Sequence, residues 1–559
     1  MTLRDLRIGI RKDYRPWSDR IAWLIGLEFG YPFELVMGEP NTPILVEPDS
    51  AISRDVDSLL KYLKSGGSIL ISHDSKFIGT VEPLEGFPVT FGGVKRIQGK
   101  GIVNVLNPLA RFFQYYSLGL GNVSLDVELR ETKCPTQEHI VFYLSENEFN
   151  HPLLICGQFK ALRYAVITLG DKDIETLRCA PLMYLTALHY LLSDKPFIRK
   201  SFWKNEKRSV VILTFDFEGL AKYSNIKRYW WWNRCFDEIL LRIGISPILR
   251  FLREKRIPST WFMLGSQVSS NPRICEKLAK EKLIEIAGHG DMHQGIDKSA
   301  QRFDKQSSEV QYQRILIMKK MIEDMLSTSI EGFRAPGLYA NVDTLMALED
   351  GGFKWDSSAS PQSNLPFREF PWPFNYVYNW EKGEMGRLVE IPVQAPWDRW
   401  CPLHKRFHST EEYEKEIRQG FEDMLFIGGV QVLLIHPYEL LKYPGYWKAV
   451  ERHVERLLKK SDVEITTCGK IAQDWMQRDE MLIQASFDEN SKLVHVKVEN
   501  GQPGLTLFVH IPEQLRIRRI VNDAGTPIPY TLWSDLGGAV FSVKANTEEF
   551  MIQLEPNPS

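Results

Sequence analysis

Residues 210–219 have the sequence VVILTFDFEG, which sets the fold of the region around them. The first residues are apolar or β-prone and predict a buried strand. Asp216 and Glu218 follow at its carboxyl end, and residues two apart in an extended chain point to the same side. Two carboxylates in this position indicate a functional site. The plainer alternative is a solvated loop or a helix N-cap.

A pair of histidines follows in residues 284–295, IEIAGHGDMHQG. His289 and His293 are four residues apart, so in a helical turn both imidazoles would lie on one face and could share a metal ion. Taken alone, the spacing also fits a chance pair on a surface helix. The three glycines of this stretch favour a metal site, because flexible backbone permits close approach.

In three further segments, polar residues come directly after a predicted strand in the sequence or near its end. Residues 332–338 (GFRAPGL) place Arg334 where it could clamp a carboxylate, although such a string is often only a turn. Residues 352–361 read GFKWDSSASP. In residues 430–439 (VQVLLIHPYE), His436 ends an apolar strand, which favours a catalytic role over that of a satisfied edge residue.

In this order the five segments resemble the polysaccharide deacetylase superfamily, also called the NodB homology domain or carbohydrate esterase family 4. The resemblance covers roughly residues 207–478. It implies a distorted parallel (β/α) barrel and a divalent-metal amidase, commonly zinc-dependent, that deacetylates amino sugars. Residues 388–393 (LVEIPV) and 436–439 look most like the branch that acts on bacterial cell-surface polysaccharides.

The resemblance implies that His289 and His293 hold the metal. The usual family pattern has two adjacent aspartates, whereas here Phe217 follows Asp216 and the second carboxylate is Glu218. We therefore expect Glu218 to bind the metal, with Asp216 as the competing ligand.

The same resemblance implies the catalytic groups. Asp216 matches the general base and Arg334 the arginine that orients it. Asp356 matches the aspartate that tunes the catalytic histidine, and His436 matches that histidine, the general acid. A zinc-like ion with three protein ligands would keep an open position for water and lower its pKa towards about 7. A backbone N–H near Tyr339 would help to stabilise the oxyanion.

Two aromatic clusters are candidates for the substrate cleft, residues 229–232 (YWWW) and 396–400 (PWDRW). Aromatic faces stack on sugar rings, so Trp232 and Trp397 are predicted substrate contacts. Core packing, an oligomer contact or a lid are the alternatives.

Residues 205–480 show the repeated strand, loop and helix of a β/α barrel, in which catalytic groups gather at the carboxyl ends of the strands. The predicted strands are 210–215, 259–263, 284–287, 332–334, 388–393 and 430–435, with helices such as 311–326 and 344–350 between them.

The flanking regions predict two further domains. Residues 1–204 read as an α/β layer, Rossmann-like or amidotransferase-like, without a glycine fingerprint for nucleotides. Residues 481–559 alternate like a small β-sandwich, a module that packs more often than it binds carbohydrate. Within the first region we expect strands at 42–46, 68–72 and 164–169, helices at 55–64 and 177–192, and a β-rich insertion at 86–150.

Length, net charge and cysteine content limit the number of domains, the kinds of partner and the compartment that we expect. A chain of 559 residues predicts two to four domains, and a net charge of -2 gives no reason to expect nucleic acid as a partner. The seven cysteines are scattered, which favours free thiols in a reducing compartment. No signal peptide or segment of about 20 apolar residues is evident, so we expect a cytoplasmic protein without an integral membrane segment.

The sequence therefore predicts a metal-dependent hydrolase, with Zn²⁺ as the favoured ion, that removes N-acetyl groups from amino sugars of a polysaccharide or its intracellular precursor. Two alternatives remain. One is a hydrolase of the same fold acting on a cyclic amide or a formylated sugar. The other is an inactive carbohydrate-binding scaffold, if Glu218 does not complete the metal site.

Overall fold

The computed structural model describes most of the chain, and the structural features below are those of the described residues. These are residues 3–11, 17–36, 42–47, 61–62, 67–71, 90–105, 123–133, 140–146, 149–159, 162–169, 180–218, 230–293, 302–360, 363, 365–367, 370–379, 384–393, 409–437 and 444–558. The chain forms two compact units. We call Lys207–Asn379 with Glu384–Met476 the central unit, and Met1–Glu206, Trp380–Gly383 and Gln477–Ser559 the terminal unit.

The central unit is built on one nine-stranded sheet. All its recorded strand pairings are parallel except the pairing of β17 with β18. The order is β17 (Phe374–Asn379), β18 (Glu384–Glu390), β16 (Trp355–Asp356), β15 (Gly332–Phe333), β14 (Ile284–Gly288), β13 (Ser259–Met263), β12 (Ser209–Phe217) and β19 (Val430–Ile435), with β20 (Val463–Thr466) also on β12. Because the strands are parallel, their carboxyl ends meet at one edge, where α/β proteins place their sites.

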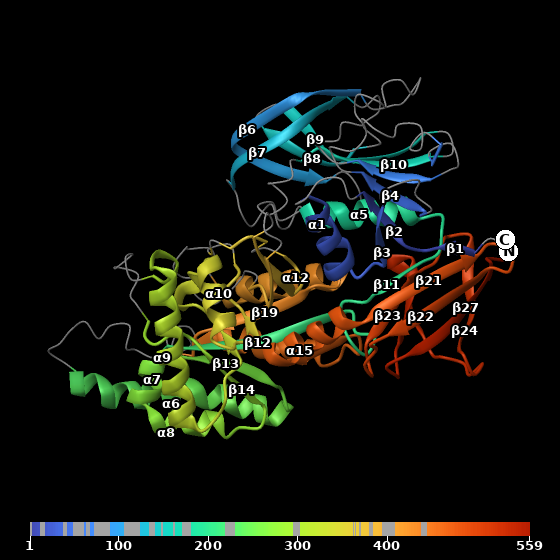
Figure 1. Cartoon of the computed structure of the whole chain (residues 1–559). Helices are drawn as coiled ribbons and strands as arrows, with labels where there is room; N and C mark the ends of the chain where they lie inside the picture. Colours follow the sequence, from blue (N-terminus) through green and yellow to red (C-terminus); the bar gives the residue numbers. More distant parts are fainter. Residues whose placement is uncertain are drawn as a thin grey trace. The chain divides into compact units, whose positions relative to one another are not determined.

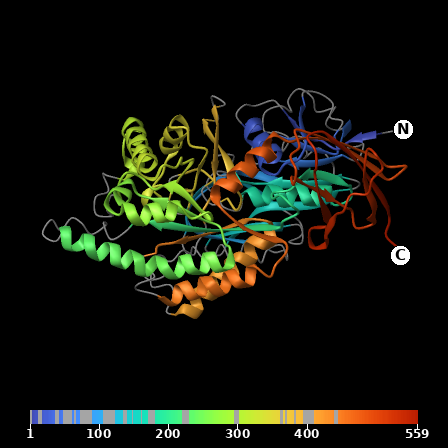
Figure 2. The same cartoon turned by 90° about the horizontal axis from the view of Figure 1, so that it is seen from below.

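Helices connect these strands and cover the sheet. They are α6 (Trp230–Lys255), α7 (Gly265–Ser270), α8 (Pro272–Ala279), α9 (Ser308–Leu326), α10 (Val342–Asp350), α12 (Thr410–Ile427), α14 (Pro444–Leu457) and α15 (Cys468–Glu480). In Figure 1, α6 to α9 gather around β13 and β14. Figure 2 shows the long green α6 beside α14, where the rings of Phe251 and Trp447 pack edge to face at 5.7 Å.

Local sequence explains where these helices begin and end. The Ser409 side chain accepts a hydrogen bond from Glu412 N and caps α12, which ends at Gly428 in the left-handed conformation. Asn341 and Thr344 form a reciprocal capping box at the start of α10. The predicted helices at 311–326 and 344–350 are therefore confirmed, and both begin slightly earlier in the chain than the sequence indicated.

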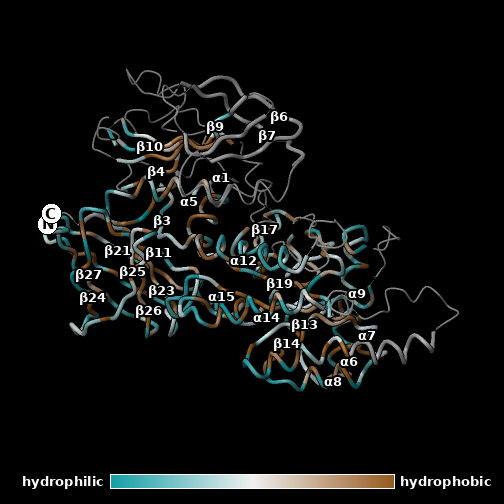
Figure 3. Tube along the Cα trace, turned by 180° about the vertical axis from the view of Figure 1, so that it is seen from behind, coloured by the Kyte–Doolittle hydropathy of each residue, from teal (hydrophilic) through white to brown (hydrophobic). Residues whose placement is uncertain are grey.

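The core of the central unit is the β12 region. Every residue of β12 is buried, and the Phe215 ring stacks on Trp261 of β13 at 4.5 Å. Burying an aromatic or aliphatic side chain of this kind contributes about 1.5–3 kcal/mol. Figure 3 shows hydrophobic colouring along the inner strands and hydrophilic residues along α15.

The mixed α/β class is confirmed, whereas closure into a barrel stays a prediction. The pairings of the described residues leave β17 and β19 as the two ends of the sheet. One backbone hydrogen bond runs from Val430 N, at the start of β19, to Pro371 O, just before β17, at 2.9 Å.

The terminal unit contains a second nine-stranded sheet formed by the N-terminal part of the chain. Its parallel half, covered by α5 (Ala180–Leu192), is β3 (Phe33–Val36), β2 (Ile8–Arg11), β4 (Ile44–Glu47), β5 (Ser68–Ile71) and β10 (Leu162–Ile167). The antiparallel half is β9 (Phe149–Phe159), β8 (Ile140–Glu146), β6 (Thr90–Val105) and β7 (Val123–Lys133). The β-rich character expected for residues 86–150 is present in β6, β7 and β8. Most of the helix expected at 55–64 lies outside the described residues.

The C-terminal part of the terminal unit forms two antiparallel sheets. One has the order β1 (Leu3–Asp5), β21 (Leu482–Asp488), β22 (Leu493–Glu499), β27 (Glu548–Pro556) and β24 (Leu515–Asn522). The other has the order β11 (Phe197–Lys200), β23 (Thr506–His510), β26 (Gly538–Ser542) and β25 (Thr531–Trp533). The rings of Phe541 and Phe550 meet between the sheets at 5.1 Å. Two strands from the N-terminal part, β1 and β11, are thus members of these sheets, which the sequence did not indicate.

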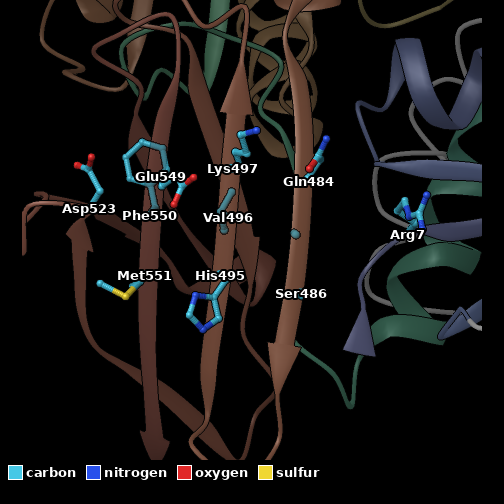
Figure 4. Close-up of a pocket in the computed structure, with 11 residues that line it drawn as sticks. Arg7, Gln484, Ser486, His495, Val496, Lys497, Asp523, Glu549, Phe550 and Met551 are labelled. Carbon is cyan, nitrogen blue, oxygen red and sulfur yellow. The ribbon is translucent and has the colours of Figure 1, made fainter. Parts of the chain in front are cut away.

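One face of the five-stranded sheet is hollowed and polar. Figure 4 shows Lys497, Glu549, His495 and Gln484 on neighbouring strands of this face. The aromatic residue of the lining, Phe550, is 1% exposed and therefore packs inward. This surface has the character of a solvated sheet face rather than of an aromatic sugar-stacking platform.

Asp423 in α12 is a buried acid with one recorded side-chain hydrogen bond, from Gln419 Nε2 at 3.0 Å. Burial raises its pKa from 3.8 to about 7. Because the folded-state pKa lies above the unfolded value, its contribution to stability is greatest at low pH and is lost as the pH rises through about 7.

We therefore expect Asp423→Asn to stabilise the protein above pH 7, by on the order of 1 kcal/mol after solvent screening, with a gain that shrinks as the pH falls towards 4. Thermal unfolding at several pH values measures this difference. Exposed Glu254→Gln, which does not act on Asp423, is the matched control, and an equal gain at every pH would contradict the explanation.

No helix in the described part of the chain has the length and apolar character needed to cross a membrane.

Candidate metal and catalytic site

The carboxylates of Asp216 and Glu218 lie at the carboxyl end of β12. Asp216 is the penultimate residue of the strand and Glu218 is the first residue after it. The two residues are 3% and 1% exposed. Buried carboxylates are costly unless they are paired or bind a cation, so their partners define the site.

The two histidines lie on the loop that follows β14, the strand beside β13. The helical turn expected for them is wrong, because β14 ends at Gly288 and residues 289–293 form an irregular loop. Gly290 has φ +90°, and a Cβ there would lie 2.9 Å from Pro336 Cγ, so a larger residue would be strained. The loop, not helical periodicity, brings both imidazoles to the carboxylates.

Neighbouring elements hold this loop in place. Gly265 N and Ser266 N at the start of α7 donate to the carbonyls of Gly290 (3.0 Å) and Asp291 (2.7 Å). The Asp291 side chain accepts from Arg314 of α9 through Nε (3.0 Å) and Nη2 (2.6 Å). Asp291, which lies between the two histidines, is therefore fixed through both its backbone and its side chain.

Carboxylates and imidazoles converge at distances suited to a shared cation. His293 Nε2 lies 2.9 Å from Glu218 Oε1, and His289 Nε2 lies 3.4 Å from the same oxygen. Asp216 Oδ2 lies 3.8 Å from His289 Nε2. Among the described residues, the group whose ligand atoms all fall within 4.8 Å of one another consists of Asp216, Glu218 and His289, as a single ion would require. The predicted ligand His293 is not part of this group and meets the cluster through Glu218.

The donor atoms fit a divalent cation. His289 Nδ1 lies 2.9 Å from the carbonyl oxygen of Arg334, so in the neutral ring the proton sits on Nδ1 and the lone pair of Nε2 faces the carboxylates. With Asp216 and Glu218 ionised, Arg334 alone among the residues of this cluster carries a fixed positive charge, and one negative charge remains. A dication would more than offset this charge and leave a net charge of +1.

Arg334 holds several groups of the site in place through hydrogen bonds. The residue is fully buried, and Nη1 donates to Asp216 Oδ1 (2.8 Å) and Thr214 Oγ1 (2.9 Å). Nε and Nη2 donate to the carbonyl and the hydroxyl of Ser357, both at 2.9 Å. The guanidinium also lies 4.0 Å from the centre of the Phe262 ring. Since its carbonyl meets His289, Arg334 touches both the proposed base and a proposed metal ligand.

Asp216 is anionic in this environment. Burial raises the pKa of its carboxyl, but the charge of Arg334, together with that of His289 and His436 whenever these rings are protonated, outweighs burial and lowers the pKa below its ordinary value. An ionised carboxylate held by one oxygen, with the other oxygen directed to the imidazoles, can accept a proton.

His436 directly follows β19, at the position that is in register with Asp216 of β12. Phe215 pairs with Ile435 in the parallel register of β12 and β19, so the next residue of each strand reaches the same height. His436 Nε2 lies 3.9 Å from Asp216 Oδ2 and 3.8 Å from Glu218 Oε1. The structure thus brings His436 close to both carboxylates, as its place at a strand end predicts.

The contacts of two further predicted site residues, Asp356 and Tyr339, are made with residues outside the carboxylate and histidine cluster. Asp356 is fully buried, and its recorded hydrogen bonds come from the backbone and hydroxyl of Ser358. The Tyr339 ring lies 3.6 Å below the guanidinium of Arg302. Before it, Leu338 has φ +62°, a conformation that is uncommon outside glycine and that concentrates at functional sites. The backbone N–H of Tyr339 makes no recorded hydrogen bond to a described residue, so it can serve a ligand.

The two predicted tryptophan contacts lie outside the described side chains. Trp232 belongs to α6, but its side chain is not among those described, and Trp397 lies wholly outside the described residues.

Sequence reasoning missed several polar residues around the site. Thr214, Ser357 and Glu390 are fully buried, and each contacts either a residue of the site or a residue that holds the site in place. The only signals in the sequence are an acid inside the apolar stretch LVEIPV and the serines after Asp356. Either pattern could have indicated a buried polar network.

Residues 204–355 match the model of the family described as Polysaccharide deacetylase, which confirms the resemblance found in the sequence. No curated protein matches the chain at a significant level.

Three solved structures are among those that match the chain. A protein of Mycobacterium smegmatis described as a polysaccharide deacetylase is 21% identical, with 49% of this chain and 92% of that chain covered and a TM-score of 0.40. For PuuE allantoinase the identity is 15%, the coverage 49% and 93%, and the TM-score 0.40. For Agd3, described as a novel carbohydrate deacetylase, the identity is 10%, the coverage 100% of both chains, and the TM-score 0.45.

Proposed function

We propose that this chain is a metal-dependent hydrolase that removes N-acetyl groups from amino sugars of a polysaccharide or its precursor. The observation that carries the proposal is the cluster of Glu218, His289 and His293 beside the Asp216–Arg334 pair, at the carboxyl ends of β12 and β14. The cluster draws on the segment that matches the polysaccharide deacetylase family.

Glu218, His289 and His293 would hold the cation. Glu218 Oε1 lies nearer to both imidazoles than Asp216 does, and one Asp216 oxygen is already engaged by Arg334. Three oxygen and nitrogen ligands with an open position suit Zn²⁺, which is the ion we propose. Such a cation supplies Lewis acidity, which strengthens a neighbouring water as an acid and stabilises negative charge on a carbonyl oxygen.

The remaining groups divide the proton transfers. Asp216 accepts a proton from the attacking water as the water oxygen bonds to the acetyl carbon. Arg334 holds this carboxylate in place through Oδ1 and leaves Oδ2 free for the transfer. The Tyr339 N–H is available to donate to the carbonyl oxygen as its charge grows.

His436, which lies 3.9 Å from Asp216 Oδ2, supplies the second proton transfer. When the C–N bond breaks, the amine is a poor leaving group unless it is protonated, and His436 supplies this proton. A positioned acid or base of this kind contributes roughly 10²–10⁴-fold to the rate. The products are acetate and the free amino sugar.

The test is acetate release from N-acetylated chito-oligosaccharides, with and without a chelator, together with metal content. We expect stoichiometric metal and chelator-sensitive acetate release from the native chain. Glu218→Gln removes a ligand charge while keeping the shape, and we expect it to lose both the bound metal and at least about 10²-fold of the activity.

The alternatives give different results. Cleavage of cyclic amides or formylated sugars without acetate release from any N-acetylated sugar would replace the proposed substrate class. Stoichiometric metal retained in Glu218→Gln would remove Glu218 from the ligands. Absence of both metal and hydrolysis in the native chain would favour an inactive scaffold.

A further inference from the structure

Two buried carboxyl groups lie side by side: Asp356, which the sequence predicts to tune the catalytic histidine, and Glu390, which no prediction assigned a role. Asp356 ends β16 and Glu390 ends β18, and the parallel register of these strands places the two residues opposite each other. Both are 0% exposed. Residues that are paired in register project to the same face of a sheet, so the two carboxyls are neighbours.

Their hydrogen bonds are unequal. Asp356 accepts from Ser358 N at Oδ2 (3.0 Å) and from Ser358 Oγ at Oδ1 (2.9 Å). Glu390 Oε1 accepts from Ala359 N at 2.8 Å, while Glu390 Oε2 receives no donor from the described residues. A buried oxygen without a donor is costly, unless it carries a proton and donates to the neighbouring carboxylate.

No described cation neutralises the pair. The ionisable groups that face it are tyrosines, Tyr376 from β17 and, more distantly, Tyr378 of the same strand, and both remain neutral because burial raises their pKa values. The nearest positive charge of the network, Arg334, reaches Ser357 rather than either carboxyl. Two adjacent buried carboxyls in such surroundings cannot both be ionised.

The segment that follows Asp356 connects this pair to the site. Ser358 Oγ donates to Asp356 and accepts from Ala335 N at 2.8 Å. Ser357 accepts twice from the Arg334 guanidinium, and the Ser357 hydroxyl in turn donates to the carbonyl of Ile391, the residue after Glu390. The position of Arg334, and through it that of Asp216, therefore depends on the backbone that the two carboxyls fix.

We propose that Asp356 and Glu390 share one proton at neutral pH, that Glu390 carries it and donates it to an anionic Asp356, and that Glu390 is thereby a positioning residue for the Arg334–Asp216 contact. Asp356 has the larger number of donors and is the better site for the charge. Burial, followed by the charge of Asp356, raises the pKa of Glu390 well above its ordinary value, in agreement with this assignment.

The shared proton has a consequence for stability that does not require the enzyme to be active. The folded chain keeps a proton that the unfolded chain releases above the ordinary pKa of glutamate. Stability from this pair therefore falls as the pH rises, and the unfolding equilibrium constant gains a factor of about ten per pH unit until the folded pair ionises.

The experiment compares denaturant unfolding of the native chain and Glu390→Gln between about pH 6 and pH 8. Glutamine keeps the shape and donates an N–H to Asp356, but carries no titrating proton. We expect the variant to show a pH dependence shallower by about one proton, whereas exposed Glu254→Gln keeps the native slope. Equal slopes for Glu390→Gln and the native chain would overturn the shared proton.

A second experiment measures acetate release by Glu390 variants, and it rests on the proposed deacetylase function. We expect Glu390→Gln to release acetate within about threefold of the native rate, and Glu390→Leu, which cannot donate, to lose at least about tenfold in kcat with little change in KM. Equal losses in both variants would overturn the positioning role. A native chain without activity would leave the slope comparison intact and would count only against the function.

If Glu390→Gln does not fold, infrared spectroscopy of the triple variant Asp423→Asn, Glu285→Gln and Glu451→Gln decides the matter, because that variant lacks the other described acids of the central unit whose pKa values are raised. A protonated-carboxyl band at pH 8 supports the shared proton, and its absence overturns it.

Discussion

Asparagine in place of Asp216 is expected to lower acetate release by about 10²–10⁴-fold, the usual contribution of a positioned base. The substitution keeps the size of the side chain and one oxygen for Arg334, but an amide cannot accept the proton of the attacking water. The decrease should appear in kcat and in kcat/KM alike, because the lost interaction belongs to the transition state. Steady-state acetate release on chito-oligosaccharides measures it.

The metal content of Asp216→Asn shows whether Asp216 is a metal ligand. If Glu218 is the carboxylate ligand, Asp216→Asn retains its metal, whereas loss of the metal would identify Asp216 as a ligand instead. Asp343→Asn, at an exposed position in the first turn of α10, is the matched control and should behave as the native chain.

Methionine in place of Arg334 is expected to destabilise the central unit by about 3–5 kcal/mol and to abolish activity. The substitution fills part of the same volume but leaves Asp216 as a buried charge without its partner, and breaking a buried pair in this way has a cost of that size. Denaturant unfolding measures the loss.

A double variant separates the orphaned charge from the lost packing. Arg334→Met with Asp216→Asn should be more stable than Arg334→Met alone, because the uncompensated carboxylate is gone. If the two losses simply add, the ion pair is not what makes Arg334 important, and its hydrogen bonds to Ser357 would carry the effect.

The strands of the central unit could be predicted because their sequences are predominantly apolar. Val210 to Phe215 and Val430 to Ile435 contain only one polar residue each, Thr214 and Gln431, which is the pattern of parallel strands buried on both faces, and both runs lie within strands of the structure. β16 was not foreseen as a strand, because two residues, Trp355 and Asp356, are too few to show a period.

The site was predicted from residue types more than from geometry. The sequence indicated that Asp216, Glu218, His289, His293 and His436 belong together, and the structure places their side chains within a few ångströms of one another. It did not indicate the loop conformation of the histidine pair, because positive φ at Gly290 depends on the close approach of Pro336 from another segment. Glu390 was missed because its partner lies on a different strand and meets it only through strand register.

The membership of β1 and β11 in the C-terminal sheets bears on how this protein can be dissected. β1 supplies the outermost strand of one sheet and β11 that of the other, and both come from the N-terminal part of the chain. A fragment that begins at residue 481 would therefore lose both strands and expose the unsatisfied backbone of β21 and β23, a template for aggregation. Binding or stability measurements on this module are therefore meaningful only when the first and last parts of the chain are kept together.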